Sequence, residues 1–402
     1  MNALLERLLG KATELTRAGR LQEATAAIQA ALRGAALPPA PTPTPTLTPN
    51  LDAAVIIDVE AREVDAPAPR ETRSPVDDHE HDHEHDRTGN AIDESPGDGD
   101  GEFLVARYAD AHGQRDYKLY LPPGEYAQPM PLVVMLHGCT QNPDDFAAGT
   151  RMNQHAREQG FAVLYPAQPT SANPAGCWNW FKHNHQRRDA GEPALLAGMV
   201  HAVLAQHPID PARVFVAGLS AGGAMAAILG DAYPELFAAI GVHSGLPTGA
   251  ATDMTTAFSA MRIGSADAGG LPLRGMRAGA RPAPAGPRVA PPTIVFHGDA
   301  DTTVHPANGE QVVQACIAAA QVNGGVNGSV PAPVVENMSN PGRNSIRRSY
   351  RNVAGTVLAE HWLLAGAGHA WSGGSAQGSY ADERGPDASC EMLRFFFAQP
   401  RR

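Results

Sequence analysis

Short apolar runs recur along the chain from residue 103 onward, and turn residues bound each of them. Such runs, separated by helix-sized segments, are typical of parallel strands buried on both faces. An opening pair of strands is expected at 103–108 and 117–121. Buried strands are expected at 131–136, 161–165, 213–217, 238–242, 293–296 and 360–364. The pattern predicts an α/β catalytic domain over 103–402, with a doubly wound, mostly parallel sheet of about eight strands.

The first hundred residues follow other patterns. Two amphipathic stripes, separated by a break at Gly19, predict a helical hairpin over 1–34. It either docks on a granule or partner protein, or packs on its own catalytic domain or a second copy. Periodicity is lost over 35–102, where a proline-rich stretch precedes an acidic one, so we expect a disordered, extended linker.

A second irregular segment, 249–291, is rich in Gly, Ala, Pro and Arg and shows no clear period. We interpret it as an insertion in the catalytic domain. Both a mobile flap near the site and a disordered loop remain open as interpretations.

Charge is concentrated in the expected linker. Residues 71–102 hold twelve acidic residues against two arginines, which is nearly all of the net charge of −11 carried by the 402 residues. The remainder is close to neutral and has no basic stripe, which argues against a nucleic-acid partner. The tract Asp77–Asp86 alternates four histidines with acids. It is either a loose divalent-metal chelator or a solvated tract, and we predict no defined metal site and no cofactor.

No apolar run reaches eighteen residues, so no membrane-spanning helix is expected. The N-terminal segment has no apolar stretch or cleavage site typical of an export signal, which favours a cytoplasmic location, with an extracellular one as the alternative. The four cysteines match neither a disulfide scaffold nor a zinc motif. Cys316 and Cys390, in expected helices, are interpreted as buried small apolar residues.

The strongest chemical signal is Gly218-Leu219-Ser220-Ala221-Gly222, directly after one expected strand and before an expected helix. Glycines two residues either side of a serine permit a sharp strand-to-helix turn that exposes the hydroxyl. The N-terminus of the helix then favours developing negative charge. Ser220 is therefore the candidate nucleophile.

A serine needs a base and an acid, which in this architecture follow in the order Ser, Asp, His. Asp299 and Asp301 follow the strand at 293–296, and we favour Asp301 because Asp299 sits in a tight turn. His369, between small residues after the last long strand, is the candidate base. The rival histidines His297 and His137 are interpreted as structural.

Backbone amides must hold the oxyanion, and the candidates are those of Cys139, in the loop after the third strand, and Ala221. A disulfide between Cys139 and Cys177 would explain a cysteine there by rigidity, and whether it forms is left open. Trp178, in an aromatic-rich loop, and Trp371 are candidate substrate-binding residues, with core packing as the alternative.

Six motifs in order resemble the polyhydroxybutyrate depolymerase family of esterases, which is related to feruloyl and acetyl-xylan esterases. They are LHGCTQNPDDFA, AGCWNWF, GLSAGG, HGDADTTV, GAGHAWSGG and the closing DASCEMLRFF, within about 128–397. The resemblance implies an α/β-hydrolase fold, a triad of Ser220, Asp301 and His369, an oxyanion site at Cys139 and a substrate groove at the tryptophans. Members that attack extracellular polymer typically carry an export signal and a separate polymer-binding domain, and neither pattern is found here.

These observations predict a serine carboxylic ester hydrolase acting through an acyl-enzyme, most directly on short-chain 3-hydroxyacyl polyesters or oligomers. A feruloyl or acetyl-xylan type esterase, acting on polysaccharide-linked esters, is the alternative. A serine peptidase and a catalytically silent protein that binds polymer or granules are further alternatives. The intact nucleophile, acid and base argue against the silent protein.

Overall fold

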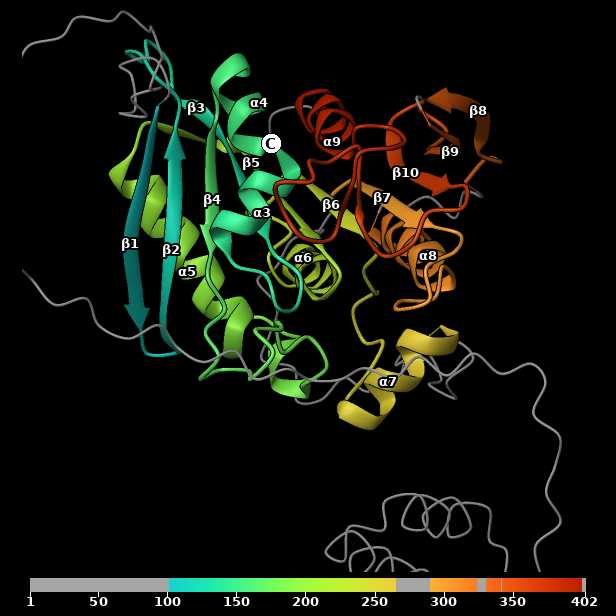
Figure 1. Ribbon diagram of the computed structural model, residues 1–402, viewed down its shortest axis with the longest axis horizontal. Coiled ribbons are helices and arrows are strands. Elements are labelled where there is room, and N and C mark those ends of the chain that lie inside the picture. The colour runs from blue at the N-terminus through green and yellow to red at the C-terminus, as the bar shows by residue number, and fades with distance from the viewer. Residues whose placement is uncertain (1–100, 265–289, 324–329, 341, 400–402) are drawn as a thin grey trace, which may run out of the picture. The chain divides into compact units, whose positions relative to one another are not determined.

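The computed structural model describes residues 101–264, 290–323, 330–340 and 342–399 (Figure 1). The expected helical hairpin at 1–34, nearly all of the expected linker and its histidine-rich tract lie outside the described residues, as does much of the expected insertion.

Ten strands form one sheet in the order β1-β2-β4-β3-β5-β6-β7-β10-β9-β8. They are β1 (Glu102–Asp110), β2 (Gly113–Leu121), β3 (Met130–Leu136), β4 (Ala162–Pro166), β5 (Ile209–Leu219), β6 (Ala239–His243), β7 (Thr293–Gly298), β8 (Val334–Asn340), β9 (Arg343–Arg351) and β10 (Val357–Leu364). The six central strands, from β4 to β10, pair in parallel, while β1, β2, β8 and β9 pair antiparallel at the two edges. β3 is buried along its whole length, as its unbroken apolar run predicts.

The predicted strands are all present, and the prediction of about eight is corrected by β8 and β9. Their sequences, VVENMSN and RNSIRRSYR, contain no continuous apolar run. β8 is the edge strand and β9 is the next strand inward, so solvent reaches this side of the sheet and polar residues are tolerated. A separate two-stranded sheet, β11 (Trp371–Ser372) with β12 (Ala381–Asp382), stabilises the loop that follows β10.

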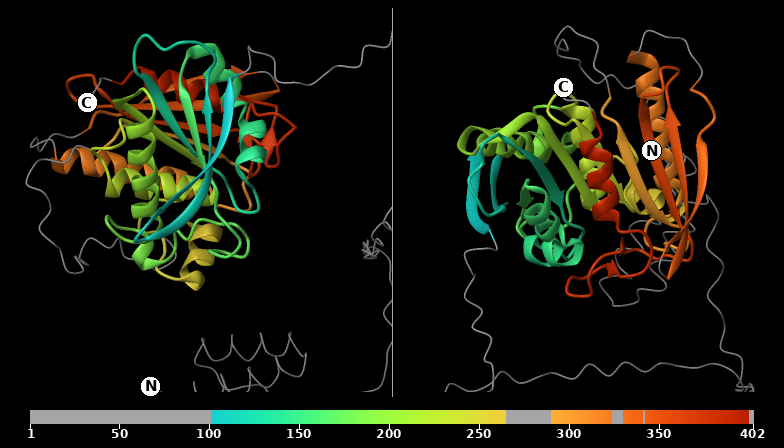
Figure 2. Two further views of the ribbon diagram at one scale, coloured as in Figure 1. Left: turned by 90° about the vertical axis from the view of Figure 1, so that its left-hand side faces the viewer. Right: turned by 90° about the horizontal axis from the view of Figure 1, so that it is seen from above.

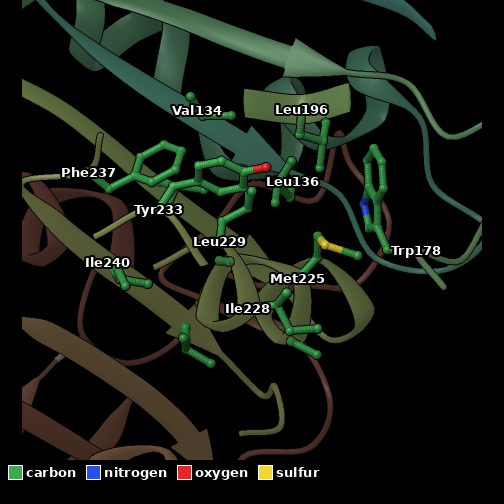
Figure 3. Close-up of a cluster of buried hydrophobic side chains, with 14 of the residues drawn as sticks. Val134, Leu136, Trp178, Leu196, Met225, Ile228, Leu229, Tyr233, Phe237 and Ile240 are labelled. Carbon is green, nitrogen blue, oxygen red and sulfur yellow. The ribbon is translucent and has the colours of Figure 1, made fainter. Parts of the chain in front are cut away.

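Helices cover both faces of the twisted sheet (Figure 2). They are α3 (Pro143–Thr150), α4 (Met152–Gln159), α5 (Gly191–Gln206), α6 (Ala221–Ala232), α7 (Met254–Ile263), α8 (Ala307–Asn323) and α9 (Ala388–Phe397), with one 3₁₀ turn, η1 (His183–His185). One core cluster joins the sheet to α5, α6 and α8, and a second joins it to α3, α4 and α9. Figure 3 shows part of the first, where Met225 and Leu229 of α6 face Val134 and Leu136 of β3.

The segment interpreted as an insertion contains a regular element that its composition did not predict. α7 begins with a capping box in which Asp253 accepts a hydrogen bond from the amide of Thr256. The backbone carbonyl of Met261 in turn accepts from the amide of His305, just after the Asp301 turn. The described part of this segment is therefore anchored beside the candidate acid.

The strand order determines where a site forms. The chain runs from β3 outward to β4 and then returns to β5 on the other side of β3, so the direction of winding reverses between β3 and β5. Ligands of open α/β sheets bind at the carboxyl ends of the strands at such a reversal. The Cys139 loop follows β3 and Ser220 follows β5, so both lie at this point. Among the described residues, no helix is long and apolar enough to cross a membrane.

Candidate active site

Ser220 occupies the sharp turn between β5 and α6, with φ 57° and ψ −118°. Glycines make this turn sterically possible. A Cβ on Gly222 would lie 2.0 Å from the carbonyl oxygen of Leu136, and a Cβ on Gly218 would lie 2.4 Å from the backbone of Gly222. The turn therefore rests directly on the end of β3, and only residues without a side chain fit at these two positions.

Backbone hydrogen bonds fix the orientation of Ser220. Its amide donates to the carbonyl of His243 at the end of β6, at 2.9 Å, and its carbonyl accepts from Ala224 within α6. Ser220 is 8% exposed. The backbone of Ser220 is thus held by these two hydrogen bonds, and its side chain lies close to solvent.

The Cys139 loop lies beside this turn and is held covalently. Cys139 is bonded to Cys177, which confirms the disulfide that the sequence left open. The adjacent Thr140 has φ 64°, and its amide donates to the carbonyl of Ala175 at 2.7 Å. The amide of Gly138 donates to the side chain of Gln141 at 2.9 Å. The loop is therefore pinned on both sides of Cys139.

The two amides predicted to hold an oxyanion donate no hydrogen bond within the part of the chain that the structure describes. The amide of Cys139 lies outside any helix or strand and donates no hydrogen bond there. Ala221 is the first residue of α6, where an amide has no partner within its helix. Both donors are available to a bound anion.

Asp301 lies in the turn after β7 and joins His369, which follows β10. Its Oδ2 lies 2.7 Å from Nδ1 of His369, and its Oδ1 accepts from the amides of Thr303 and Val304, both at 2.9 Å. An ionised carboxylate only accepts hydrogen bonds, so Nδ1 of His369 carries the proton and Nε2 is left as the basic nitrogen. Asp299 instead accepts from the amide of Gly366 at 2.6 Å.

Burial and hydrogen bonding act in opposite directions on Asp301. Its side chain is fully buried, which raises the pKa, but the hydrogen bond and charge of His369 and the amide of Val304 outweigh this effect. The pKa of Asp301 is therefore below its ordinary value, and the carboxylate is ionised at neutral pH. It can both orient the imidazole and stabilise its protonated form.

The described residues contain no hydrogen bond between the Ser220 hydroxyl and His369. His243 nevertheless connects the Ser220 turn to the segment that follows His369. The carbonyl of His243 accepts from the amide of Ser220, while its ring stacks on Trp371 with 5.1 Å between centroids. Its Nε2 accepts from the amide of Ser372 at 3.0 Å. Catalytic hydrogen bonds are often completed only when substrate binds.

Three buried histidines near the site, the rivals His297 and His137 together with His243, are held by hydrogen bonds of their own. Desolvation lowers the pKa of His243 to about 3 and that of His297 to about 4, so both rings are neutral near pH 7. His297 contacts the carbonyl of Val304 at 2.8 Å through Nε2. The buried His137 accepts from the amide of Gln168. None of these three histidines makes a shorter contact with Asp301 than His369 does.

The two tryptophans that are candidates for substrate binding are both buried, as the core-packing alternative expects. Trp178 is 0% and Trp371 1% exposed, so neither ring can line a groove. Trp178 packs beside Met225 in the core (Figure 3), and its Nε1 donates to the carbonyl of His137. Nε1 of Trp371 donates to the hydroxyl of Ser389 in α9. Both indoles therefore pack beneath the surface and help to hold the loops of the site in place.

Sequence reasoning missed the buried carboxylate of Glu192, at the start of α5. It accepts from the side chains of Gln168 at 2.6 Å and Asn179 at 2.7 Å, and from the amide of Asn179 at 2.8 Å. Burial raises its pKa, but these bonds and His185 outweigh that effect and lower it overall. An acid in the first turn of a helix is ordinary in sequence, and its partners are too distant along the chain to be recognised. Glu192 fixes the segment that carries Cys177.

The remaining cysteines differ from each other. Cys316 of α8 is partly buried, and its thiol lies 3.4 Å from the carbonyl oxygen of Leu358. Cys390 is exposed on α9, so the prediction that it is a buried small residue is wrong. Within the described ranges, no group of three or more His, Cys, Asp and Glu side chains could hold a metal ion.

The chain is similar in sequence to one protein family and to several known esterases. Residues 115–330 match the sequence model of the esterase PHB depolymerase family. Poly(3-hydroxyalkanoate) depolymerase C of Paucimonas lemoignei is 32% identical over 268 residues, 66% of this chain and 60% of that protein. Feruloyl esterase B of Thermothelomyces thermophilus is 31% identical over 216 residues, 52% of this chain and 72% of that protein. A probable acetylxylan esterase A of Aspergillus fumigatus is 30% identical, over 47% of this chain and 51% of that protein.

The chain thus spans between half and two thirds of the length of the depolymerase and the acetylxylan esterase. Among solved structures, the acetyl xylan esterase from Aspergillus awamori superposes with a TM-score of 0.52 at 21% identity, covering 73% of this chain and 99% of that one. This likeness confirms the expected α/β-hydrolase fold. The family match covers more than half of the chain, and the chain belongs to the esterase PHB depolymerase family.

Proposed function

We propose that the protein is a serine carboxylic ester hydrolase in which Ser220, His369 and Asp301 form the catalytic triad. The observation that carries this proposal is the 2.7 Å contact between Asp301 and Nδ1 of His369, which leaves Nε2 as a base at the same end of the sheet as the Ser220 turn. Membership of an esterase family supports the reaction class.

In the first step, the hydroxyl oxygen of Ser220 attacks the ester carbonyl carbon while Nε2 of His369 takes the hydroxyl proton. The carbonyl oxygen becomes an oxyanion, and the free amides of Cys139 and Ala221 donate to it. The bond to the alcohol oxygen then breaks, and the same proton passes from His369 to that oxygen. Asp301 stays ionised throughout and stabilises the imidazolium, as its lowered pKa permits.

The second step releases the acid. Water gives a proton to Nε2 of His369 and attacks the acyl-enzyme carbonyl, so that the oxyanion forms again between the same two amides. Collapse of this intermediate breaks the bond to Ser220, and the serine oxygen regains its proton from His369. The imidazole therefore serves once as base and once as acid in each half of the cycle.

We favour 3-hydroxyalkanoate polyesters or oligomers as substrates. The depolymerase relative matches a larger share of this chain, 66%, than the feruloyl esterase at 52% or the acetylxylan esterase at 47%. The nearly neutral charge outside residues 71–102 suits an uncharged ester. The two other relatives keep feruloyl and acetyl esters of polysaccharides as the second candidate class.

The proposal is tested with a p-nitrophenyl acyl series, polyhydroxybutyrate film and methyl ferulate. Ser220→Ala should lower turnover by about 10⁴-fold or more. Ser339→Ala, on the exposed part of the edge strand β8, is a matched serine control that should leave turnover unchanged. Preference for film or short 3-hydroxy esters supports the polyester, and preference for ferulate supports the second class. Wild-type turnover equal to that of Ser220→Ala on every ester would refute the enzyme.

We also propose that residues 1–34 attach the enzyme to a polymer granule or a partner protein. The amphipathic stripes of this segment support the proposal, and the charged linker would give it reach. A chain beginning at Gly101 should lose association with granules while keeping its turnover of soluble esters. Unchanged association would show that the segment has no targeting role.

A further inference from the structure

Tyr380 is an aromatic residue at the site that the mechanism does not use. It is 47% exposed, whereas Trp178 and Trp371 are buried. Its ring packs edge-to-face with the imidazole of His369, with 6.4 Å between centroids. Its hydroxyl lies 3.4 Å from the Thr140 hydroxyl, which donates to it from the residue after Cys139. Tyr380 therefore spans the space between the base and the oxyanion loop.

The backbone of Tyr380 is held in an unfavourable conformation. Its φ is 51°, a region that residues with a Cβ rarely adopt and that persists only where the surroundings enforce it. The amide of Trp371 donates to the carbonyl of Tyr380 at 2.7 Å, and β12 begins at the next residue. The position of the ring is thus determined by the buried base of the loop.

The preceding residue is fixed to the oxyanion loop. The amide of Ser379 donates to Asp145 at 2.7 Å, and its carbonyl accepts from the side chain of Gln141 at 2.9 Å. The same Gln141 side chain accepts from the amide of Gly138. One network therefore places both the loop before Cys139 and the exposed ring.

Core packing does not explain these contacts. A tyrosine retained for packing buries its ring and satisfies its hydroxyl internally, but this ring is about half exposed. Exposed large apolar side chains next to a reacting centre instead offer area to a ligand. The contact with His369 places the ring beside the imidazole that, in the proposed mechanism, protonates the departing alcohol.

We propose that Tyr380 is a specificity-determining residue whose ring contacts the alcohol portion of the bound ester. This inference rests on the proposed function and adds the determinant of alcohol selectivity. In a 3-hydroxyalkanoate chain the alcohol portion is the next monomer, so the ring would contact the chain beyond the scissile bond. The hydroxyl of Tyr380 is not required, because the contact is made by the ring.

The test holds the acyl group constant and varies the alcohol. Methyl butyrate and benzyl butyrate pass through the same butyryl-enzyme, so differences between them arise before deacylation. Tyr380→Ala should raise KM for benzyl butyrate about tenfold and that for methyl butyrate less than about twofold, with kcat nearly unchanged for both. Tyr380→Phe should retain the wild-type preference.

The outcomes separate a substrate contact from a structural role. A wild-type ratio of kcat/KM for benzyl over methyl butyrate in Tyr380→Ala overturns the proposal. An equal fall for both esters also overturns it, because a displaced His369 would affect them alike. If the alanine variant does not fold, Tyr380→Leu carries the same comparison with a smaller loss of contact area. Failure of the hydrolase proposal is distinct, since the wild type would then be no faster than Ser220→Ala.

Discussion

The two halves of the candidate site are held in position by different forces. The half after β3 and β5, with the Cys139 loop and Ser220, is fixed by backbone contact at Gly222 and by a disulfide. The half after β7 and β10 is fixed by the hydrogen bond between two ionisable side chains, Asp301 and His369. The first half sets positions that do not depend on protonation. The second sets the protonation of the base, so substitutions in the two halves should have different consequences.

The largest expected effect is on the side-chain half. Asp301→Asn should lower kcat by about 10⁴-fold, because an amide that faces Nδ1 with its NH₂ group stabilises the wrong tautomer of His369. The free energy of unfolding should change much less, since the amide oxygen can still accept from Thr303 and Val304. The measurements are ester turnover and urea unfolding.

Asp299→Asn is the matched control for that substitution. Its oxygen can continue to accept from Gly366, and turnover should stay within about threefold of wild type. If Asp299→Asn lowered turnover more than Asp301→Asn does, Asp299 would be the catalytic acid. The contrast between the two halves of the site would then no longer hold.

The backbone half should respond to a single methyl group. Gly222→Ala places a carbon 2.0 Å from the Leu136 carbonyl oxygen, and we expect about 3 kcal/mol or more of destabilisation together with loss of turnover. Gly368→Ala, next to His369, is the counterpart, because a Cβ there meets nothing within 4 Å. Thermal melting should separate the two variants. Equal destabilisation would show that backbone packing constrains both halves alike.

The disulfide should contribute a comparable amount to the free energy of unfolding. Closing a loop of 38 residues in sequence between Cys139 and Cys177 is worth about 4 kcal/mol by chain entropy. The double substitution of both cysteines by serine should therefore lower the urea midpoint, while Cys390→Ser, at an exposed thiol, should not. Identical midpoints for the double variant and wild type would mean that hydrogen bonds alone hold the Cys139 loop.

Glu192 tests the difference between the two halves, because it is an ionisable group in the half that backbone contacts and the disulfide hold. In either orientation, Glu192→Gln puts an NH₂ group against at least one donor from Gln168 or Asn179, and we expect about 2 kcal/mol of destabilisation. Turnover should fall without a shift in its pH profile, because Glu192 acts on position alone. A shifted profile would show that charge in this half also controls the base.

The smallest expected effect is the change in the free energy of unfolding that each buried imidazole causes per pH unit. His243 and His297 have folded pKa values of about 3 and 4, below the ordinary value near 6.5. Their contribution to stability is therefore complete above about pH 6.5 and is lost as the pH falls toward the folded values. Each should remove about 1.4 kcal/mol per pH unit in that window. Denaturant melts at pH 7, 6 and 5 measure the slope, and a flat profile would mean that neither ring is buried as described.

The sequence predicts the half-site whose signals are local. Glycines around Ser220 and small residues around His369 lie within a few positions of the groups they serve, so their purpose can be recognised from spacing. Central strands are recognised for the same reason, because burial on both faces requires an unbroken apolar run. The edge strand β8 and its neighbour β9 lack such a run, so the sequence does not predict them.

What the sequence misses depends on partners that are distant along the chain. Trp178 is buried because Met225 of α6 packs beside it, and nothing near position 178 indicates this. Tyr380 lies in a loop rich in Gly and Ser, and its contacts with Thr140 and His369 join segments far apart in sequence. An aromatic cluster predicts a contact surface but does not determine whether that surface faces the core or the ligand.

The order of strands along the chain also constrains when activity can arise during folding. The carboxylate follows β7 and the imidazole follows β10, which pairs with β7 in parallel and is the last long strand to be synthesised. Parallel pairing of distant segments is slow compared with helix formation. The proposed nucleophile can thus be in place while the proposed base is still absent, so we expect a nascent or partly folded chain to be inactive on esters. During refolding, recovered turnover should lag behind recovered helical signal and report the pairing of the final central strand.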